Sequence, residues 1–432
     1  MHYAKKPLDM KELVIIIFAL IALFNSISAQ SCLSDGIWFS HQSEVDSFSI
    51  NYPNCTEIVG TVDIIGDDIT NLNGLSAITS IGGQLWIRDN PILSDISGLS
   101  NLTTITGDLN FLNNPILLSL NGFNNLTSVE YVDFFSDTIT SLNGLNSLSH
   151  VGGDFHIGSA KLLTDISALS GLTSIGGALI IVGATALENF NGLNNLKIIG
   201  RYLTLLNNSS LTSLYGLNNL SQIGEYFEIK NNDALTGLNE LDSLISVGSS
   251  IEIWNNDTLI NLNGLERISS INGRIYIYDN MALANIEGIK NISAASISDL
   301  YIINNNNLST CEVQSICDYL SNPNGTVEIH GNKTGCNSQQ EIEEACLNLG
   351  FKDRYHTDEF ALFPNPSDRE FCILTPSNWI TQEINIYNFV GQHIKSFVGQ
   401  INQVSVSTLQ RGIYFVELIS HDMKIRMKLI VN

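Results

Sequence analysis

A unit of about 24 residues occurs eleven times in succession between about Gly60 and Cys311. One copy runs from Gly82 to Ile105, and six further 24-residue copies begin at Thr106, Gly152, Gly176, Gly200, Gly224 and Gly248. The copies that begin at Gly60 and Glu130 have 22 residues, whereas Asn272 begins a slightly longer copy and Ile297 a truncated last one. This period predicts a solenoid, because one unit cannot bury its apolar residues alone and stacked neighbours build a continuous core.

Apolar residues occupy positions 4, 6, 12, 15, 18, 21 and 24 of the unit; in one copy they are Leu85, Ile87, Leu93, Ile96, Leu99, Leu102 and Ile105. The alternation at positions 4 and 6 indicates a strand. The later spacing of three predicts a tight coil that returns under the strand, because an amphipathic helix would mix spacings of three and four. Glycine at positions 1, 2 and 17 predicts bends that leave no room for a side chain or that need a positive φ.

Asparagine dominates position 9, as Asn90, Asn114, Asn208, Asn232, Asn256, Asn280 and Asn305. An inward asparagine at each turn would hydrogen-bond the backbone groups that the bend leaves unpaired. Ala160 and Ala184 interrupt this series, and we expect looser turns there.

The charge of the chain argues against nucleic acid and acidic membranes as partners. The 432 residues carry a formal net charge of −23, concentrated in residues 30–359. Phosphate binding needs clusters of Lys and Arg, which these repeats lack. The chain contains no Gly-rich phosphate loop, HExxH or GxSxG motif, so the sequence predicts no cofactor and no catalytic metal.

Residues 1–29 have the pattern of a secretory signal peptide. Basic Lys5, Lys6 and Lys11 precede an apolar stretch from Leu13 to Phe24, and small residues follow up to Ala29. Twelve apolar residues are too few to span a bilayer, which disfavours the alternative of a membrane anchor. No later segment is long and apolar enough to be transmembrane, so we expect none in the mature chain.

Six of the seven cysteines flank the repeats, and we expect them to close disulfide-bonded caps at residues 30–59 and 311–348. They are Cys32, Cys55, Cys311, Cys317, Cys336 and Cys346. The positions favour a Cys32–Cys55 bridge and two bridges among the last four, whose pairing stays open. Zinc binding by the last cluster and lipidation of Cys32 are weaker alternatives, since the spacing is irregular and lipidation would leave Cys55 alone. Cys372, between apolar Phe371 and Ile373, is expected to be buried.

The repeats resemble the leucine-rich-repeat class, and within it the receptor L-domain-like repeats of bacterial surface proteins. The matching pattern is Gly-Leu-x-x-Leu-x-x-Ile-Gly-Gly-x-Leu-x-Ile-x-x-Asn, and the resemblance covers about residues 32–348. The double glycine and the missing helical segment depart from ordinary leucine-rich repeats. The solenoid, at residues 60–310, is therefore expected to be flatter and more β-helical than a curved horseshoe.

A polar linker, residues 349–359, leads to a separate module at residues 360–432. Its short alternating strands, separated by Gly, Asn and Pro, predict a small β-sandwich. Its landmarks are Leu362-Phe-Pro-Asn-Pro-Ser367, Ile384-Asn-Ile-Tyr-Asn-Phe-Val-Gly391 and Leu409-Gln-Arg-Gly-Ile-Tyr-Phe-Val-Glu-Leu418. The module resembles the type A C-terminal sorting domain of the type IX secretion system of Bacteroidota. The resemblance implies that this machinery is a partner, that the tail is removed, and that the protein is secreted or attached to the outer-membrane surface.

Positions 3, 5 and 7 of each unit are expected to face outward and to stack into columns on the sheet. The later rungs place aromatic and charged residues there: Tyr202, Tyr226, Glu228, Glu252, Trp254, Arg274, Tyr276, Tyr278 and Tyr301. Exposed aromatic patches mark contact surfaces, so we predict that this face binds a glycan or a protein. The alternative is that these rings are good strand formers that pair across rungs for stability alone.

Catalysis is not expected. Glu228 and Glu252 would lie about 4.8 Å apart on neighbouring strands, but on an open sheet without a cleft to exclude water. Asp154 and His156 share a face without a nucleophile and are expected to be solvated. The sequence thus predicts an all-β, leucine-rich-repeat-like solenoid with disulfide caps and a small C-terminal β-sandwich, acting as a non-catalytic binding or adhesion module. A structural spacer is the alternative, and a polysaccharide-degrading enzyme a remote one.

Overall fold

The computed structural model describes residues 30–136, 138–347, 360–375, 380–399, 401–420 and 423–432. The predicted signal peptide, residues 1–29, and the predicted linker, residues 349–359, lie outside the described residues. The chain forms two compact units. The repeat unit runs to Ser309 and includes Pro323–Lys333, and the C-terminal unit comprises Thr310–Asn322 and Thr334–Asn432.

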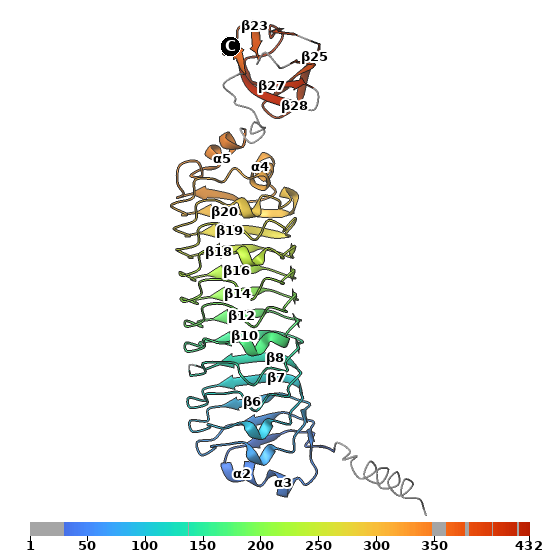
Figure 1. Ribbon diagram of the computed structural model, residues 1–432, viewed down its shortest axis with the longest axis vertical. Coiled ribbons are helices and arrows are strands. Elements are labelled where there is room, and N and C mark those ends of the chain that lie inside the picture. Colours follow the sequence, from blue (N-terminus) through green and yellow to red (C-terminus); the bar gives the residue numbers. More distant parts are fainter. Residues whose placement is uncertain (1–29, 137, 348–359, 376–379, 400, 421–422) are drawn as a thin grey trace, which may run out of the picture. The chain divides into compact units, whose positions relative to one another are not determined.

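The repeat unit is a stack of parallel strands, one long strand for each rung (Figure 1). The rungs pair in register, as Leu203 with Phe227 and Phe227 with Ile251. This main stack consists of β2 (Ile37–Phe39), β4 (Val62–Ile64), β6 (Leu85–Arg88), β7 (Thr104–Leu112), β8 (Ser128–Phe135), β10 (Phe155–Gly158), β12 (Leu179–Val182), β14 (Leu203–Leu206), β16 (Phe227–Lys230), β18 (Ile251–Trp254), β19 (Gly273–Tyr278), β20 (Ile297–Ile303) and β21 (Val327–His330). The predicted solenoid of stacked strands is confirmed.

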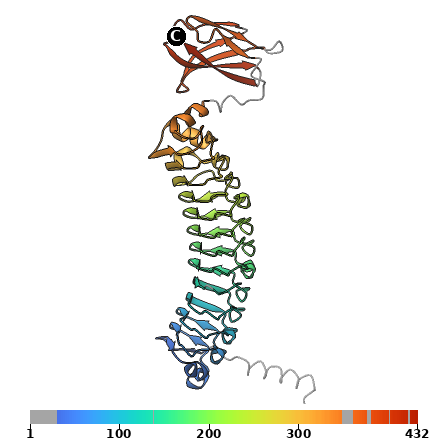
Figure 2. The same ribbon diagram turned by 90° about the vertical axis from the view of Figure 1, so that its left-hand side faces the viewer.

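A second, shorter parallel stack precedes the main strands, at positions 23 and 24 of the unit. It consists of β1 (Ser31–Cys32), β3 (Glu57–Ile58), β5 (Ser80–Ile81), β9 (His150–Val151), β11 (Ser174–Ile175), β13 (Ile198–Ile199), β15 (Gln222–Ile223) and β17 (Ser246–Val247). Strands β7 and β8 run through both stacks. Figure 2 shows the repeat unit edge-on, with a gentle bend along the stack instead of the tight curve of a horseshoe.

The return segments are coils and single 3₁₀ turns. The turns are η1 (Asn73–Leu75), η2 (Ser97–Leu99), η3 (Ser167–Gly171), η4 (Asn239–Leu241), η5 (Glu287–Ile289) and η6 (Ala294–Ser296). A 3₁₀ helix has three residues per turn, which explains the apolar spacing of three. Leu93, Ile96, Leu99 and Leu102 are at most 2% exposed. Each buried Leu or Ile contributes roughly 1.5–3 kcal/mol, so the stack rests on this prism of aliphatic side chains.

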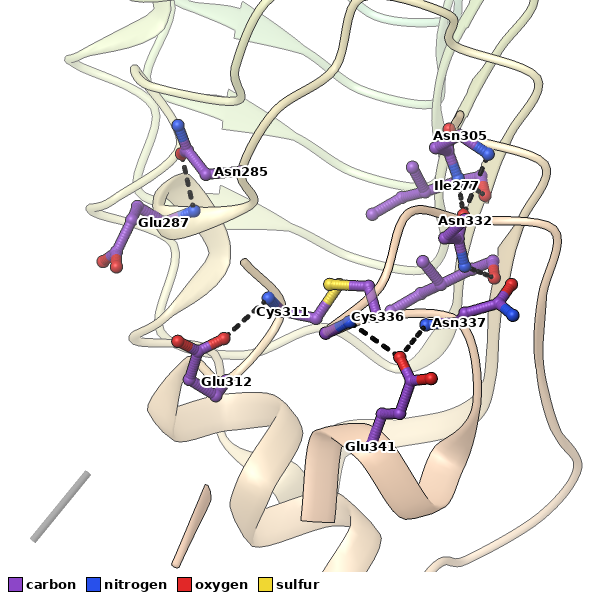
Figure 3. The surroundings of a disulfide bond; sticks show 12 residues. Ile277, Asn285, Glu287, Asn305, Cys311, Glu312, Asn332, Cys336, Asn337 and Glu341 are labelled. Atoms are coloured by element: carbon purple, nitrogen blue, oxygen red, sulfur yellow. Dashed lines mark hydrogen bonds between the residues drawn. A yellow bond between two sulfur atoms is a disulfide. The ribbon is translucent and has the colours of Figure 1, made fainter. Parts of the chain in front are cut away.

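The asparagines at position 9 form a buried ladder along one corner of the solenoid. Asn256 is representative: its Nδ2 donates to the carbonyls of Ile229 (3.1 Å) and Trp254 (3.0 Å). Its Oδ1 accepts from the backbone N–H of Asn232 at 3.1 Å. The ladder extends beyond Asn305 to Asn332, whose Oδ1 accepts from the Asn305 N–H at 2.8 Å (Figure 3). At Ala184 the turn keeps its bond to the next rung, because the Ala184 N–H donates to Asn208 Oδ1 at 2.9 Å.

Two further columns shape each turn. Position 8, just before the ladder, has a positive φ at Asp89, Asn113, Ser159, Asn207, Asn231, Asn255, Asp279 and Asn304. Asn and Asp tolerate this left-handed conformation better than most residues. At position 1 a side chain on Gly200, Gly224 or Gly248 would overlap the carbonyl oxygen of the glycine one rung earlier. There the need for glycine comes from close backbone approach.

Three disulfides join the six flanking cysteines. Cys32–Cys55 forms as predicted, and the last four pair as Cys311–Cys336 and Cys317–Cys346. Figure 3 shows Cys311–Cys336 with Glu341, whose carboxylate accepts from the N–H groups of Gly335 and Asn337. The chain segments before the first predicted repeat and after the last also form helices that the sequence interpretation missed: α2 (Gln42–Asp46), α3 (Phe48–Asn51), α4 (Gln314–Ser321) and α5 (Gln339–Cys346).

The C-terminal module consists of two antiparallel sheets around one core. The first contains β22 (Ala361–Phe363), β23 (Glu370–Leu374) and β26 (Gln403–Ser405). The second contains β25 (His393–Val398), β24 (Glu383–Asn388), β27 (Gly412–Ser420) and β28 (Met423–Val431). Phe371 and Ile373 of one sheet and Ile384 and Val416 of the other share the core. Cys372 is exposed, so its predicted burial is wrong: it alternates with Phe371 and Ile373 along β23 and points to the opposite face.

Candidate binding surface

Seven of the nine predicted binding residues lie on the outer face of β16, β18, β19 and β20, and the other two, Tyr202 and Tyr226, come just before β14 and β16. In the strands they alternate with buried Ile251, Ile253, Ile275 and Ile277, so the predicted strand register is confirmed. Strand pairing aligns Glu228, Glu252, Tyr276 and Tyr301 in one column. A second column contains Lys230, Trp254 and Tyr278. We call the nine predicted residues, together with Lys230, the aromatic band.

One end of the band is a stacked tyrosine pair. The rings of Tyr202 and Tyr226 lie 4.5 Å apart with planes 8° from parallel. The Arg201 guanidinium lies over Tyr202, 5.1 Å from the ring centre, and pairs with Glu225 at 3.3 Å. Arg201 was not among the predicted residues; its position beside the tyrosine column is the signal that could have found it.

The other end is a group of four rings. Trp254 meets Tyr276 edge-to-face at 6.3 Å, and Tyr276 contacts Tyr278 at 5.8 Å and Tyr301 at 5.6 Å. The Lys230 ammonium lies 3.5 Å from the Trp254 ring centre, a cation–π contact that sequence reasoning missed. These rings are half-buried by one another, which fixes their orientation before any ligand arrives.

Two glutamates lie among the rings in different electrostatic environments. Glu252 pairs with Arg274 at 3.0 Å. Glu228 accepts from Trp254 Nε1 at 3.4 Å and Thr204 Oγ1 at 3.5 Å. Burial raises the pKa of Glu228, and repulsion from Glu252 adds to this effect. Burial likewise raises the pKa of Tyr226 and of Tyr276, so both phenols stay neutral hydrogen-bond donors.

The band therefore combines ring faces with fixed donors and acceptors on a flat sheet. Ring faces can stack on the C–H faces of sugars or on apolar side chains, and the carboxylates and phenols can hydrogen-bond hydroxyl groups. The band brings the nine predicted residues onto one face, but in two groups: Tyr202 with Tyr226, and Trp254 with Tyr276, Tyr278 and Tyr301.

A separate hollow of about 250 Å³ lies on the same sheet face at β7 to β12. It is lined by Asp108, Asn110, Tyr131, Val132, Asp133, Asp154, His156 and Ile180, which we call the acidic hollow. Burial raises the pKa of Asp108, with further repulsion from Glu130 and Asp133. The sequence analysis considered Asp154 and His156 but not the hollow, because its residues come from four rungs and are brought together by strand pairing.

Asp154 and His156 belong to this hollow and are less solvated than expected. His156 Nδ1 lies 3.0 Å from Asp133 Oδ1, and the His156 ring packs against Phe135 at 4.8 Å. Asp154 Oδ1 accepts from the Ala178 N–H at 2.7 Å. Both side chains are about one quarter exposed, because neighbouring rungs enclose them.

Neither region is arranged as a metal centre. The described part of the chain contains no group of three or more His, Cys, Asp or Glu side chains placed to hold a metal ion. Among the same residues, no helix has the length and apolar character needed to cross a membrane.

Two family models match parts of the chain. Residues 54–149 match the receptor L domain, and residues 361–432 match the secretion system C-terminal sorting domain. No curated protein gives a significant match. The first match covers the early rungs, and the second covers the two-sheet module. The chain thus carries a receptor L-type repeat domain and a type A sorting domain of the type IX secretion system, which directs it to the cell surface or the extracellular space.

Proposed function

We propose that this secreted protein is a non-catalytic recognition module that binds a glycan on the aromatic band. The observation that supports this most is that the band is confined to particular rungs. The outward positions of the preceding rung hold Ala178, Ile180 and Val182, whereas β16 to β20 present tyrosines, a tryptophan and paired charges. A solenoid used only as a spacer has no need of such a local difference.

Pre-organisation supports binding by this face. The Tyr202–Tyr226 stack and the Trp254–Tyr276 contact hold the rings in place, so a ligand would not bear the entropy cost of ordering them. The Glu252–Arg274 pair offers acceptor and donor groups side by side. Ring faces flanked by such polar groups suit the alternating C–H and hydroxyl surfaces of a sugar chain.

Catalysis receives less support from the same geometry. Glu252 is engaged by Arg274, and Glu228 is held by Trp254 and Thr204. Both lie on an open sheet, without enclosing walls that would exclude water from a reacting bond. We therefore assign these carboxylates to ligand contact.

The test is binding of the full chain, with its disulfides formed, to an array of polysaccharides and oligosaccharides. Trp254→Ala and Tyr276→Ala should each weaken selective binding at least about tenfold, the change expected when about 1.4 kcal/mol of stacking is lost. Tyr215→Ala is the matched control, because Tyr215 is a half-exposed tyrosine outside the band. Unchanged binding by the folded Trp254 and Tyr276 variants would contradict the proposal and leave cross-rung packing as the role of these rings.

A further inference from the structure

The acidic hollow contains two buried polar atoms that the protein leaves without hydrogen bonds. Asn110 Nδ2, a donor, belongs to a side chain that is only 6% exposed. Asp133 Oδ1, an acceptor, lies 3.0 Å from His156 Nδ1 but outside hydrogen-bond geometry. An unmade hydrogen bond at a buried donor costs roughly 1–3 kcal/mol, so such a pair calls for a partner.

The two atoms lie side by side. Asn110 on β7 and Asp133 on β8 are register partners at equivalent positions of their rungs, and both line the hollow. Neighbouring strands are about 4.8 Å apart, so one group between the two side chains can reach both. That group must accept from the amide and donate to the carboxylate. A hydroxyl does both, whereas an ammonium only donates and a carboxylate or phosphate only accepts.

The rest of the hollow suits a sugar ring. The Tyr131 side chain is 41% exposed at the rim and lies across Gly153, where a side chain on the glycine would overlap the ring. An exposed ring of this kind can stack on a sugar face. Asp154 and Asp108 add carboxylate acceptors, with Asp108 held by Gln84 Nε2 at 2.8 Å. A volume of about 250 Å³ is below the roughly 300–1,000 Å³ typical of drug-sized ligands, and so suits one ring of a longer chain.

Charge selects among sugars. Three carboxylates line the hollow, and repulsion among acidic groups contributes to the raised pKa of Asp108. Arg201 lies 3.8 Å from Asp154 but is already paired with Glu225. Uronic acids, sulfated sugars and phosphates would therefore be repelled.

We propose that the acidic hollow is a subsite for a neutral, hydroxyl-rich sugar, in which one ligand hydroxyl bridges Asn110 Nδ2 and Asp133 Oδ1. The two atoms are shielded from solvent, so the Asn110 amide and the Asp133 carboxylate both turn toward the ligand on binding. These χ2 rotations are soft torsions. This subsite rests on the glycan recognition proposed above and adds a preference for neutral over anionic sugars. Its residues are distinct from those of the aromatic band.

The experiment titrates the full chain with neutral oligosaccharides of mannan, xylan and β-glucan and with anionic oligosaccharides of alginate. At least one neutral series should bind, and alginate should not. Asn110→Leu, which keeps the side chain's size, and Asp133→Asn, which keeps its shape, should each weaken that binding about tenfold. Glu328→Gln should leave it unchanged, because Glu328 is an exposed carboxylate of the same column at the last rung.

Each other result overturns the subsite. Equal binding by the wild type, Asn110→Leu and Asp133→Asn would do so, as would preferential binding of alginate or a blank titration. Hydrogen exchange matched to the wild type in peptides that cover residues 104–158 establishes that the variants are folded around the hollow. If Trp254→Ala abolishes binding while Asn110→Leu and Asp133→Asn do not, the hollow is refuted and the aromatic band stands. The reverse pattern refutes the band and retains the hollow.

Discussion

Replacing Asn256 with alanine should open the solenoid locally. The Asn256 amide donates to Ile229 O (3.1 Å), Trp254 O (3.0 Å) and Asn280 Oδ1 (3.1 Å). Its oxygen accepts from the Asn232 N–H at 3.1 Å. The substitution leaves that buried N–H without a partner and removes bonds from two carbonyls. At roughly 1–3 kcal/mol for the orphaned donor and about 1 kcal/mol for each of the two carbonyl bonds, we expect a loss of about 3–5 kcal/mol.

Hydrogen exchange followed by mass spectrometry measures this loss where it occurs. Stacked repeats need not unfold as one cooperative unit, so a global midpoint can miss a local opening. Peptides that cover residues 227–280 should lose protection, whereas those from the C-terminal module should not. Asn256→Asp keeps the acceptor but removes the donors and buries a charge, and should be more damaging than the alanine variant.

Asn307→Ala is the matched control. Asn307 is exposed and makes one 3.3 Å bond to Ala282 O, so its loss should change stability by less than about 0.5 kcal/mol. If Asn256→Ala and Asn307→Ala had equal effects on exchange, the ladder would not stabilise the stack and the reasoning would be refuted.

Two further predictions concern titration and thiol chemistry. Because burial raises the folded-state pKa of Glu228 above its ordinary 4.5, its ionisation opposes folding, and stability should fall as pH rises from about 4.5 through the folded pKa. Glu228→Gln should flatten this part of the profile in denaturation at pH 4 to 8, and an unchanged slope would contradict the assignment. Exposed Cys372 should react with a maleimide in the native protein at one thiol per chain, while the six disulfide-bonded cysteines do not react; a stoichiometry of zero would place Cys372 in the core after all.

The period and the apolar spacing were sufficient to predict the stacked strands and the inward Asn ladder. Both follow from local repetition, in which each residue meets its own copy one rung away, as Asn232 meets Asn256. The second strand stack was missed because two residues, such as Ser246–Val247, are too short to show an alternation. The cap helices were missed for a related reason, since each occurs once and lacks the support of a period.

The surface was less predictable than the core. Placing Tyr202 to Tyr301 on one face required only the strand alternation. The packing of these rings depends on side-chain rotamers, which the repeat pattern does not predict. The cation–π contact of Lys230 with Trp254, at 3.5 Å, was therefore missed. The acidic hollow arises where Asn110 and Asp133, at equivalent positions of neighbouring copies, meet Asp154 of a third copy, and the side chains at these positions differ from copy to copy. A repeat consensus contains only the residues that the copies share, so it does not show side chains that differ from copy to copy.

Because the rungs are equivalent, whole repeats can be lost or gained during evolution. Residues 200–223 form a whole unit, and their removal would join Ile199 to Gly224 and so recreate the existing Ile199–Gly200 junction. The 24-residue copies that begin with glycine share the same junction, so recombination between them can shorten or lengthen the domain without creating a new interface. Each gain or loss of one repeat would change the length of the stack by about 4.8 Å. The length of the solenoid can therefore vary by whole repeats, whereas the few rungs with distinctive side chains must be kept for binding.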